Sequence, residues 1–148
     1  MIRRFWIIPV LAAALVACER DMMSEKGFAL PDGDAAAGRE AFVLFQCYEC
    51  HSIAGEEFPE IPGIVPPYVE LGGRVTRVKT YGELVTAIIN PSHKLAKGYA
   101  EAQIAVDGES KMAFYNHYMT VQELNDLVAY LQPHYDVVVP NMRYHVYP

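Results

Sequence analysis

The stretch Cys47-Tyr48-Glu49-Cys50-His51 decides how the rest of this sequence is interpreted. Two cysteines separated by two residues, with a histidine directly after the second, are typical of a site where haem is attached covalently. Each thiol adds across a vinyl group on one edge of the porphyrin, so both sulfurs must project from one short turn. The next residue then falls beneath the ring centre, where a neutral imidazole can bind iron. We therefore predict one haem c, bound through Cys47 and Cys50, with His51 as an iron ligand.

Other sites also contain two cysteines at this spacing, and they remain alternatives. Zinc sites and thiol redox centres both use it. Zinc would need a second pair of cysteine or histidine ligands, and the only other cysteine is Cys18. A thioredoxin-like centre would follow a core strand, and no strand pattern precedes Cys47. Haem attachment is the favoured interpretation.

The first residues are typical of an exported precursor. Arg3 and Arg4 precede an apolar run over residues 5–16, which is short for a membrane span. Small residues then lead to Cys18, as in the signal of bacterial lipoproteins. We predict that residues 1–17 are a lipoprotein signal peptide and that lipidated Cys18 anchors a periplasmic protein to a bacterial membrane. An ordinary secretory signal cut near Ala17 and a retained membrane anchor are the alternatives.

The acidic composition limits the choice of partner. The chain has 12 Lys and Arg against 18 Asp and Glu, a formal charge of −6. Loss of Arg3 and Arg4 with the signal peptide would leave the remainder more acidic. This charge argues against nucleic acid and favours a partner with a basic docking patch. An acidic surface also simply keeps a protein solvated, so charge alone does not decide the partner.

Capping residues and apolar spacing predict three helices. The first follows Asp34, an N-cap residue, and continues to residue 46, with Gly38 allowing another helix to approach closely. The other two begin at capping boxes that open with Thr80 and Thr120, and prolines end both of them. The first and last helices are expected to cross and pack together.

The remaining segments complete the domain prediction. Residues 18–32 form a tether, and residues 33–132 form one domain of the all-α class. Glycine and proline make residues 52–73 a loop. Val75 and Val78 would also suit a strand, but we interpret that segment as loop. The extension 133–148 is too apolar for a free tail, so we expect it to pack on the domain or on a partner.

Methionine at position 112 is the predicted sixth ligand of the iron. It lies in a polar loop between two capped helices, where a soft thioether can face the iron. Met119 has another explanation, because it and Leu124 occupy the two positions of a hydrophobic staple. His93 and His117 are the alternatives, and either would give bis-histidine iron of lower potential. The further candidates beyond the loop are His134, Met142 and His145.

A backbone carbonyl is also expected to fix the His51 ring. Pro66 and Pro67 lie where such a carbonyl can accept a hydrogen bond from the imidazole Nδ1–H, and Pro67 is favoured. The alternative is that the two prolines merely stiffen a loop.

Taken together, these patterns resemble the class I c-type cytochromes, which are small monohaem electron carriers. The resemblance implies a cytochrome c fold, thioethers at Cys47 and Cys50, His51 as proximal ligand and Met112 as distal ligand. It also implies that Arg74 reaches a haem propionate, with an ordinary exposed arginine as the alternative. Ala113 departs from the family, which usually has proline there. The residues that carry the resemblance are Gly33-Asp34-Ala35-Ala36-Ala37-Gly38, Cys47-Tyr48-Glu49-Cys50-His51, Pro67, Leu71-Gly72-Gly73-Arg74, Met112 and Leu127-Val128-Ala129-Tyr130-Leu131, with Gly38, Phe42 and Tyr130 at the helix crossing.

Electron transfer is the function that follows from iron with both axial positions filled. Such iron has no site for a substrate, and the sequence contains no Ser-His-Asp arrangement or phosphate-binding glycine loop. The expected partners are a respiratory complex or a periplasmic oxidoreductase. The alternatives are a haem subunit of a periplasmic oxidoreductase or peroxidase and a gas-binding sensor, both with a displaceable sixth ligand.

Overall fold

The computed structural model describes residues 30–59, 62, 69–77 and 79–138. The predicted signal peptide, Cys18, most of the tether and Pro67 lie outside these residues, as do Met142 and His145. Within the described part, the main helices are α2 (Ala35–Leu44), α3 (Tyr81–Ile89), α4 (Glu101–Ile104) and α5 (Val121–Leu131). None of them has the length and hydrophobicity that crossing a membrane requires.

Single 3-10 turns and short strands lie between these helices and after the last of them. The turns are η1 (Cys47–Glu49), η2 (Pro91–His93), η3 (Tyr115–His117) and η4 (Gln132–His134). The strands form three pairs: β1 (His51–Ile53) with β2 (Val69–Leu71) and β3 (Gly73–Val75) with β6 (Tyr135–Val137), both parallel, and β4 (Ala105–Val106) with β5 (Glu109–Ser110), antiparallel. The described chain is therefore mostly helical, with strands that the all-α prediction did not include.

The predicted starts of the three helices are confirmed. The Asp34 carboxylate caps α2 by accepting hydrogen bonds from two backbone N–H groups. Both capping boxes are present, with Thr80 opening α3 and Thr120 opening α5. The first helix ends at Leu44 rather than at residue 46, because Gln46 adopts a left-handed conformation with φ 54° that an α-helix cannot contain.

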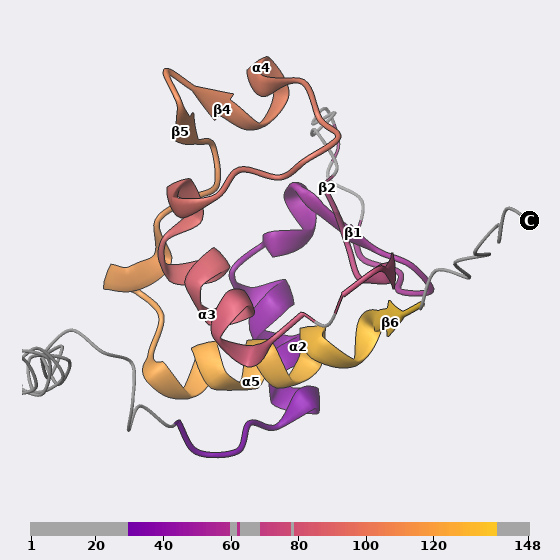
Figure 1. The fold of residues 1–148 in the computed structure, drawn as a ribbon. Coiled ribbons are helices and arrows are strands. Elements are labelled where there is room, and N and C mark those ends of the chain that lie inside the picture. Colours follow the sequence, from indigo (N-terminus) through magenta and orange to yellow (C-terminus); the bar gives the residue numbers. More distant parts are fainter. Residues whose placement is uncertain (1–29, 60–61, 63–68, 78, 139–148) are drawn as a thin grey trace, which may run out of the picture. The chain divides into compact units, whose positions relative to one another are not determined.

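The first and last helices cross at a glycine, and Figure 1 shows α5 running across α2. A Cβ atom on Gly38 would lie 2.0 Å from the backbone oxygen of Asp126 and 2.7 Å from Cβ of Tyr130. The Phe42 ring, 1 % exposed, meets the Tyr130 ring edge-on at 5.9 Å between centroids. Only glycine allows the two backbones to approach this closely.

Buried polar side chains of α5 connect this helix to the N-cap of α2, to α3 and to the segment before α2. The Asp126 carboxylate, on a residue only 6 % exposed, accepts hydrogen bonds from the backbone N–H of Asp34 at 2.7 Å and from the side chain of Gln122. Asn125 is 1 % exposed; it accepts from the Tyr81 hydroxyl at 2.8 Å and donates to the carbonyl of Pro31. Because these groups are paired inside the protein, their burial carries little penalty.

The apolar core connects α2, α3 and α5 and borders the pocket described below. Its members are Ala41, Phe42, Ile53, Leu84, Val85, Ile88, Leu124, Leu127, Val128, Tyr130 and Leu131. One face of α3 contributes Leu84, Val85 and Ile88, as its spacing predicts.

The segment before α3 is predicted from the sequence to be a loop. This prediction is wrong for Gly73–Val75, which form the strand β3. Its three residues pair in parallel with β6, in the register Gly73 with Tyr135 and Val75 with Val137. The pairing therefore connects the segment after the glycine-rich loop to the chain beyond α5. A strand of three residues is too short to show an alternating pattern, so the contact arises from tertiary pairing.

Candidate functional site

The two cysteines of the motif lie on one tight turn at the end of α2. Gln46 turns the chain out of the helix, and η1 begins at once with Cys47. The backbone N–H of Cys50 donates to the carbonyl of Cys47 at 3.2 Å, which closes the turn. Cys47 lines a pocket and is partly buried, whereas Cys50 is exposed. This is the single short turn that attachment to two neighbouring vinyl groups requires.

Both thiols favour the protonated form. Burial raises the pKa of Cys47 to about 11. Burial and the nearby carboxylate of Glu49 raise the pKa of Cys50. Thiol redox centres use cysteines whose pKa is lowered, so these surroundings do not favour that alternative.

His51 is held by the first strand pair. It opens β1, and its ring nitrogen Nδ1 lies 3.0 Å from the carbonyl oxygen of its register partner Val69. A carbonyl can only accept, so Nδ1 carries the proton and Nε2 keeps a free lone pair. Burial lowers the pKa of His51, an effect that the bond to Val69 partly opposes. The imidazole is therefore neutral near pH 7 and presents Nε2 as a metal ligand.

The acceptor predicted for His51 was Pro67, which lies outside the described residues. The carbonyl that the structure places at Nδ1 belongs to Val69, two residues further along. Sequence reasoning missed Val69 because its role depends on the parallel pairing of β1 and β2, and each of these strands is only three residues long.

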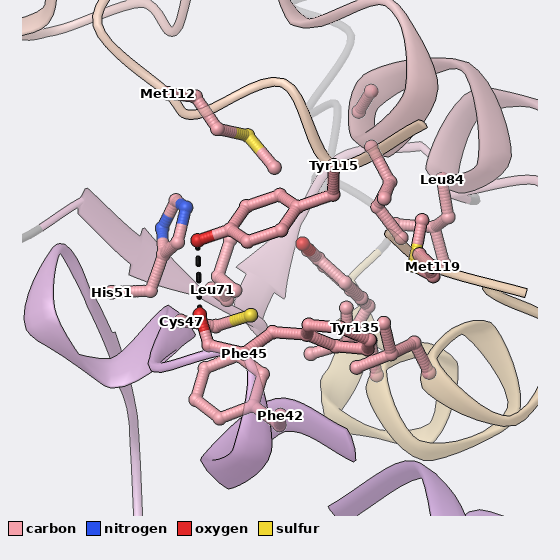
Figure 2. A pocket seen from close by; sticks show the side chains of 14 residues that line it. Phe42, Phe45, Cys47, His51, Leu71, Leu84, Met112, Tyr115, Met119 and Tyr135 are labelled. Carbon is pink, nitrogen blue, oxygen red and sulfur yellow. Dashed lines mark hydrogen bonds between the residues drawn. The ribbon is translucent and has the colours of Figure 1, made fainter. Parts of the chain in front are cut away.

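Next to Cys47 and His51 is an apolar pocket of about 630 Å³, part of which is open to solvent. Figure 2 shows its side chains converging from α2, α3, α5, the motif and the loop around Met112. Most of the side chains that line it are aliphatic or aromatic, as in pockets that hold cofactors and other small molecules. The lining residues are Phe42, Phe45, Cys47, His51, Leu71, Leu84, Ala87, Ile88, Met112, Tyr115, Met119, Leu127, Leu131 and Tyr135.

Two thioethers reach this pocket. Met112 points into it from the loop before η3, and in Figure 2 its sulfur lies on the same side of the view as His51. Met119 also lines the pocket, and it packs against the core as a staple residue should. Neither His93 nor His117 lines the pocket, and both are exposed. The structure thus brings Met112, but neither of these two histidines, into the pocket with His51.

Arg74 is not part of the pocket wall. It is an exposed residue of β3. Its predicted contact with a haem propionate therefore stays a prediction.

Sequence reasoning also missed two tyrosines of the pocket wall. Tyr115 follows Met112 in the same loop, and its hydroxyl donates to the carbonyl of Phe45 at 2.9 Å. Tyr135 belongs to β6, so the described part of the C-terminal extension contributes directly to the pocket. The aromatic patch after Met112 was a usable signal for Tyr115. No local pattern indicates Tyr135, because its position depends on the pairing of β6 with β3.

The arrangement fits a covalently bound haem. It combines an apolar pocket, a cysteine at its wall with a second at the surface, a neutral imidazole with a free Nε2, and a thioether in the same pocket. A small helical domain with these features belongs to the class of c-type haem proteins.

Comparison with known families places the chain within this class. Residues 35–134 match the family model described as Cytochrome c, and the chain belongs to the cytochrome c family. No curated protein and no solved structure matched the chain significantly. Members of the family bind haem c covalently and typically carry electrons, and Cys47 and Cys50 stand in the corresponding motif.

Proposed function

We propose that this protein is a monohaem c-type cytochrome of class I that carries electrons, with His51 and Met112 as the two axial ligands of its iron. The observation that carries the proposal is the presence of Met112 and the free Nε2 of His51 in one apolar pocket next to Cys47. With both axial positions filled, no position remains for a substrate. Only an electron then needs to enter or leave.

The bound haem would supply a reversible one-electron change at its iron. The residues around the haem determine the reduction potential at which that change occurs. The hydrogen bond from His51 to Val69 orients the imidazole and raises its basicity. The apolar wall excludes water, and a methionine ligand favours a higher reduction potential than a second histidine would.

Electrons would exchange at the haem edge near Cys50. Cys50 is exposed, whereas Cys47 lies against the pocket. The segment around the motif carries the acidic residues Glu40, Glu49 and Glu57. This local charge supports a redox partner with a basic docking surface, such as a respiratory complex or a periplasmic oxidoreductase.

A charge reversal beside the motif tests the carrier function and its docking face. Glu57 is exposed, and only its backbone carbonyl bonds to Arg39, so Glu57→Lys leaves that bond in place. In stopped-flow oxidation by a small cationic metal complex, we expect the wild type to react by simple bimolecular electron transfer. At low salt, the rate constant of the variant should be about threefold lower than that of the wild type. This is the effect expected when one negative charge near the haem edge becomes positive and repels the cationic oxidant. The difference should disappear at high salt.

The matched control makes the same change of net charge in another element. Glu101 is exposed at the start of α4, and Glu101→Lys should slow the reaction less. Equal slowing by both variants would reject the docking face. Absence of outer-sphere electron exchange in the wild type would reject the carrier function.

We further propose that the protein is exported and anchored to a bacterial membrane by lipid on Cys18. The support is the sequence of residues 1–18: two arginines, an apolar run and small residues before a cysteine. More than one acyl chain on that residue would give stable anchoring. Export also agrees with haem attachment, because thiols that are joined to haem outside the cytoplasm suit an oxidising compartment such as the periplasm.

Replacing the anchoring residue tests this proposal. Cys18→Ser should give a haem-containing protein that carries no acyl chain, because no thiol remains for acylation. The intact mass of the wild type should correspond to a chain that begins at Cys18 and carries lipid and one haem. A variant that still carries acyl chains, or a wild-type mass without lipid, would contradict the proposal.

A further inference from the structure

The Tyr115 hydroxyl makes a long-range contact across the wall of the pocket. It donates to the carbonyl oxygen of Phe45 at 2.9 Å, and 70 residues separate the two in sequence. Figure 2 shows this bond between Met112 above and Cys47 below. The two rings also pack edge to face, with centroids 5.6 Å apart. Hydroxyl and ring therefore both attach Tyr115 to Phe45.

The acceptor of this bond lies at the joint between helix and motif. Phe45 is the C-cap residue of α2, where carbonyl groups lack partners within the helix. Gln46 follows in the left-handed conformation, and Cys47 comes next. Tyr115 supplies a partner for the Phe45 carbonyl, so the bond holds the backbone that directs Cys47 toward the pocket.

Other bonds attach the Met112 loop, residues 111–118, to the opposite wall. Directly before the loop, the backbone N–H of Ser110 in β5 donates to the hydroxyl of Ser92 in η2 at 3.1 Å. Within the loop, the side chain of Asn116 donates to the carbonyl of Ile89 in α3 at 2.9 Å. Both of these acceptors belong to the α3 and η2 side. Tyr115 makes the hydrogen bond that connects the loop to the side bearing Cys47, among the residues that the structure describes.

From this geometry we propose that Tyr115 is a positioning residue that holds Met112 on the iron by fastening the Met112 loop to the end of α2. The inference rests on the proposed His51 and Met112 ligation. If the bond to Phe45 is lost, the loop keeps its attachment to α3 and η2 but opens more often on the motif side. An external ligand then competes more easily for the position of Met112, because its apparent affinity rises with the fraction of open molecules.

Tyr115→Phe tests the proposal because it keeps the ring and removes only the hydroxyl. In the haem-loaded protein, we expect the dissociation constant of imidazole for the oxidised iron to fall by about fivefold to tenfold, as loss of one partly buried hydrogen bond predicts. Amide hydrogen exchange should accelerate by a similar factor at Tyr118 and Met119, since both N–H groups donate to the carbonyl of Tyr115. Tyr118→Phe is the control: Tyr118 is in the same loop and 80 % exposed, and its variant should bind imidazole as the wild type does.

The proposal requires both changes in Tyr115→Phe. If either imidazole binding or amide exchange equals that of the wild type, or if Tyr118→Phe has the same effect, the positioning role is wrong. If the oxidised wild type lacks the weak red absorption band of a sulfur-to-iron bond, Met112 ligation itself is rejected. If the wild type has that band but Tyr115→Phe leaves imidazole binding and amide exchange unchanged, only the role of Tyr115 is rejected.

Discussion

Met112→Ala should remove the weak red sulfur-to-iron band from the oxidised spectrum while leaving the haem covalently attached. Alanine cannot coordinate iron, so one axial position opens. The reduced variant should then bind carbon monoxide, whereas the reduced wild type should not. Truncating a pocket methionine also removes packing, so we expect the free energy of unfolding to fall by about 2–5 kcal/mol. Absorption spectra with and without carbon monoxide, and denaturant titration, check these effects.

Met119→Leu is the matched control for this substitution. Met119 lines the same pocket and packs against the core, and leucine keeps its volume and its role in the staple. This variant should keep the sulfur-to-iron band and lose less than about 1.5 kcal/mol of stability. Loss of the band in Met119→Leu, with retention in Met112→Ala, would mean that Met119 is the ligand.

Gly38→Ala should strongly destabilise the domain, although alanine is the better helix former. The new Cβ would lie 2.0 Å from the backbone oxygen of Asp126, and a backbone atom cannot rotate away. The two helices would have to separate, which also disturbs the contact of Phe42 with Tyr130. We expect a loss of about 3 kcal/mol or more in denaturant titration, at the upper end of overpacking effects. This is a large fraction of the stability of a typical domain.

Gly82→Ala provides a control with the opposite sign. Gly82 lies in α3, and a Cβ atom added there would meet nothing within 4 Å. Alanine should therefore leave stability unchanged or raise it by up to about 1 kcal/mol. If both glycine variants behave alike, the close helix crossing at Gly38 does not determine the stability of the fold.

The features that sequence predicted well depend on local chemistry. The N-cap of Asp34 and the two capping boxes satisfy free N–H groups within one helical turn, so they are visible in a few consecutive residues. The spacing of Cys47 and Cys50 likewise reflects one turn of chain. Gly38 was identified because glycine inside a helix is unfavourable without a compensating contact.

The features that sequence missed depend on residues far apart in the chain. Val69 meets His51 through a strand pair of three residues, and Tyr135 reaches the pocket because β6 pairs with β3. Tyr115 finds its acceptor 70 residues away. The sequence around Asp126 suggests an ordinary surface carboxylate. In the structure this carboxylate is buried and accepts a hydrogen bond from the backbone N–H of Asp34. None of these contacts has a pattern within its own segment.

The binding of carbon monoxide to the reduced wild-type protein tests the central claim most directly. If His51 and Met112 occupy both axial positions, the iron is suited to electron transfer only. Adding carbon monoxide to the reduced protein at neutral pH should therefore leave its visible spectrum unchanged. Rapid formation of a carbon monoxide complex would show an open or easily displaced position and would contradict the assignment as an electron carrier.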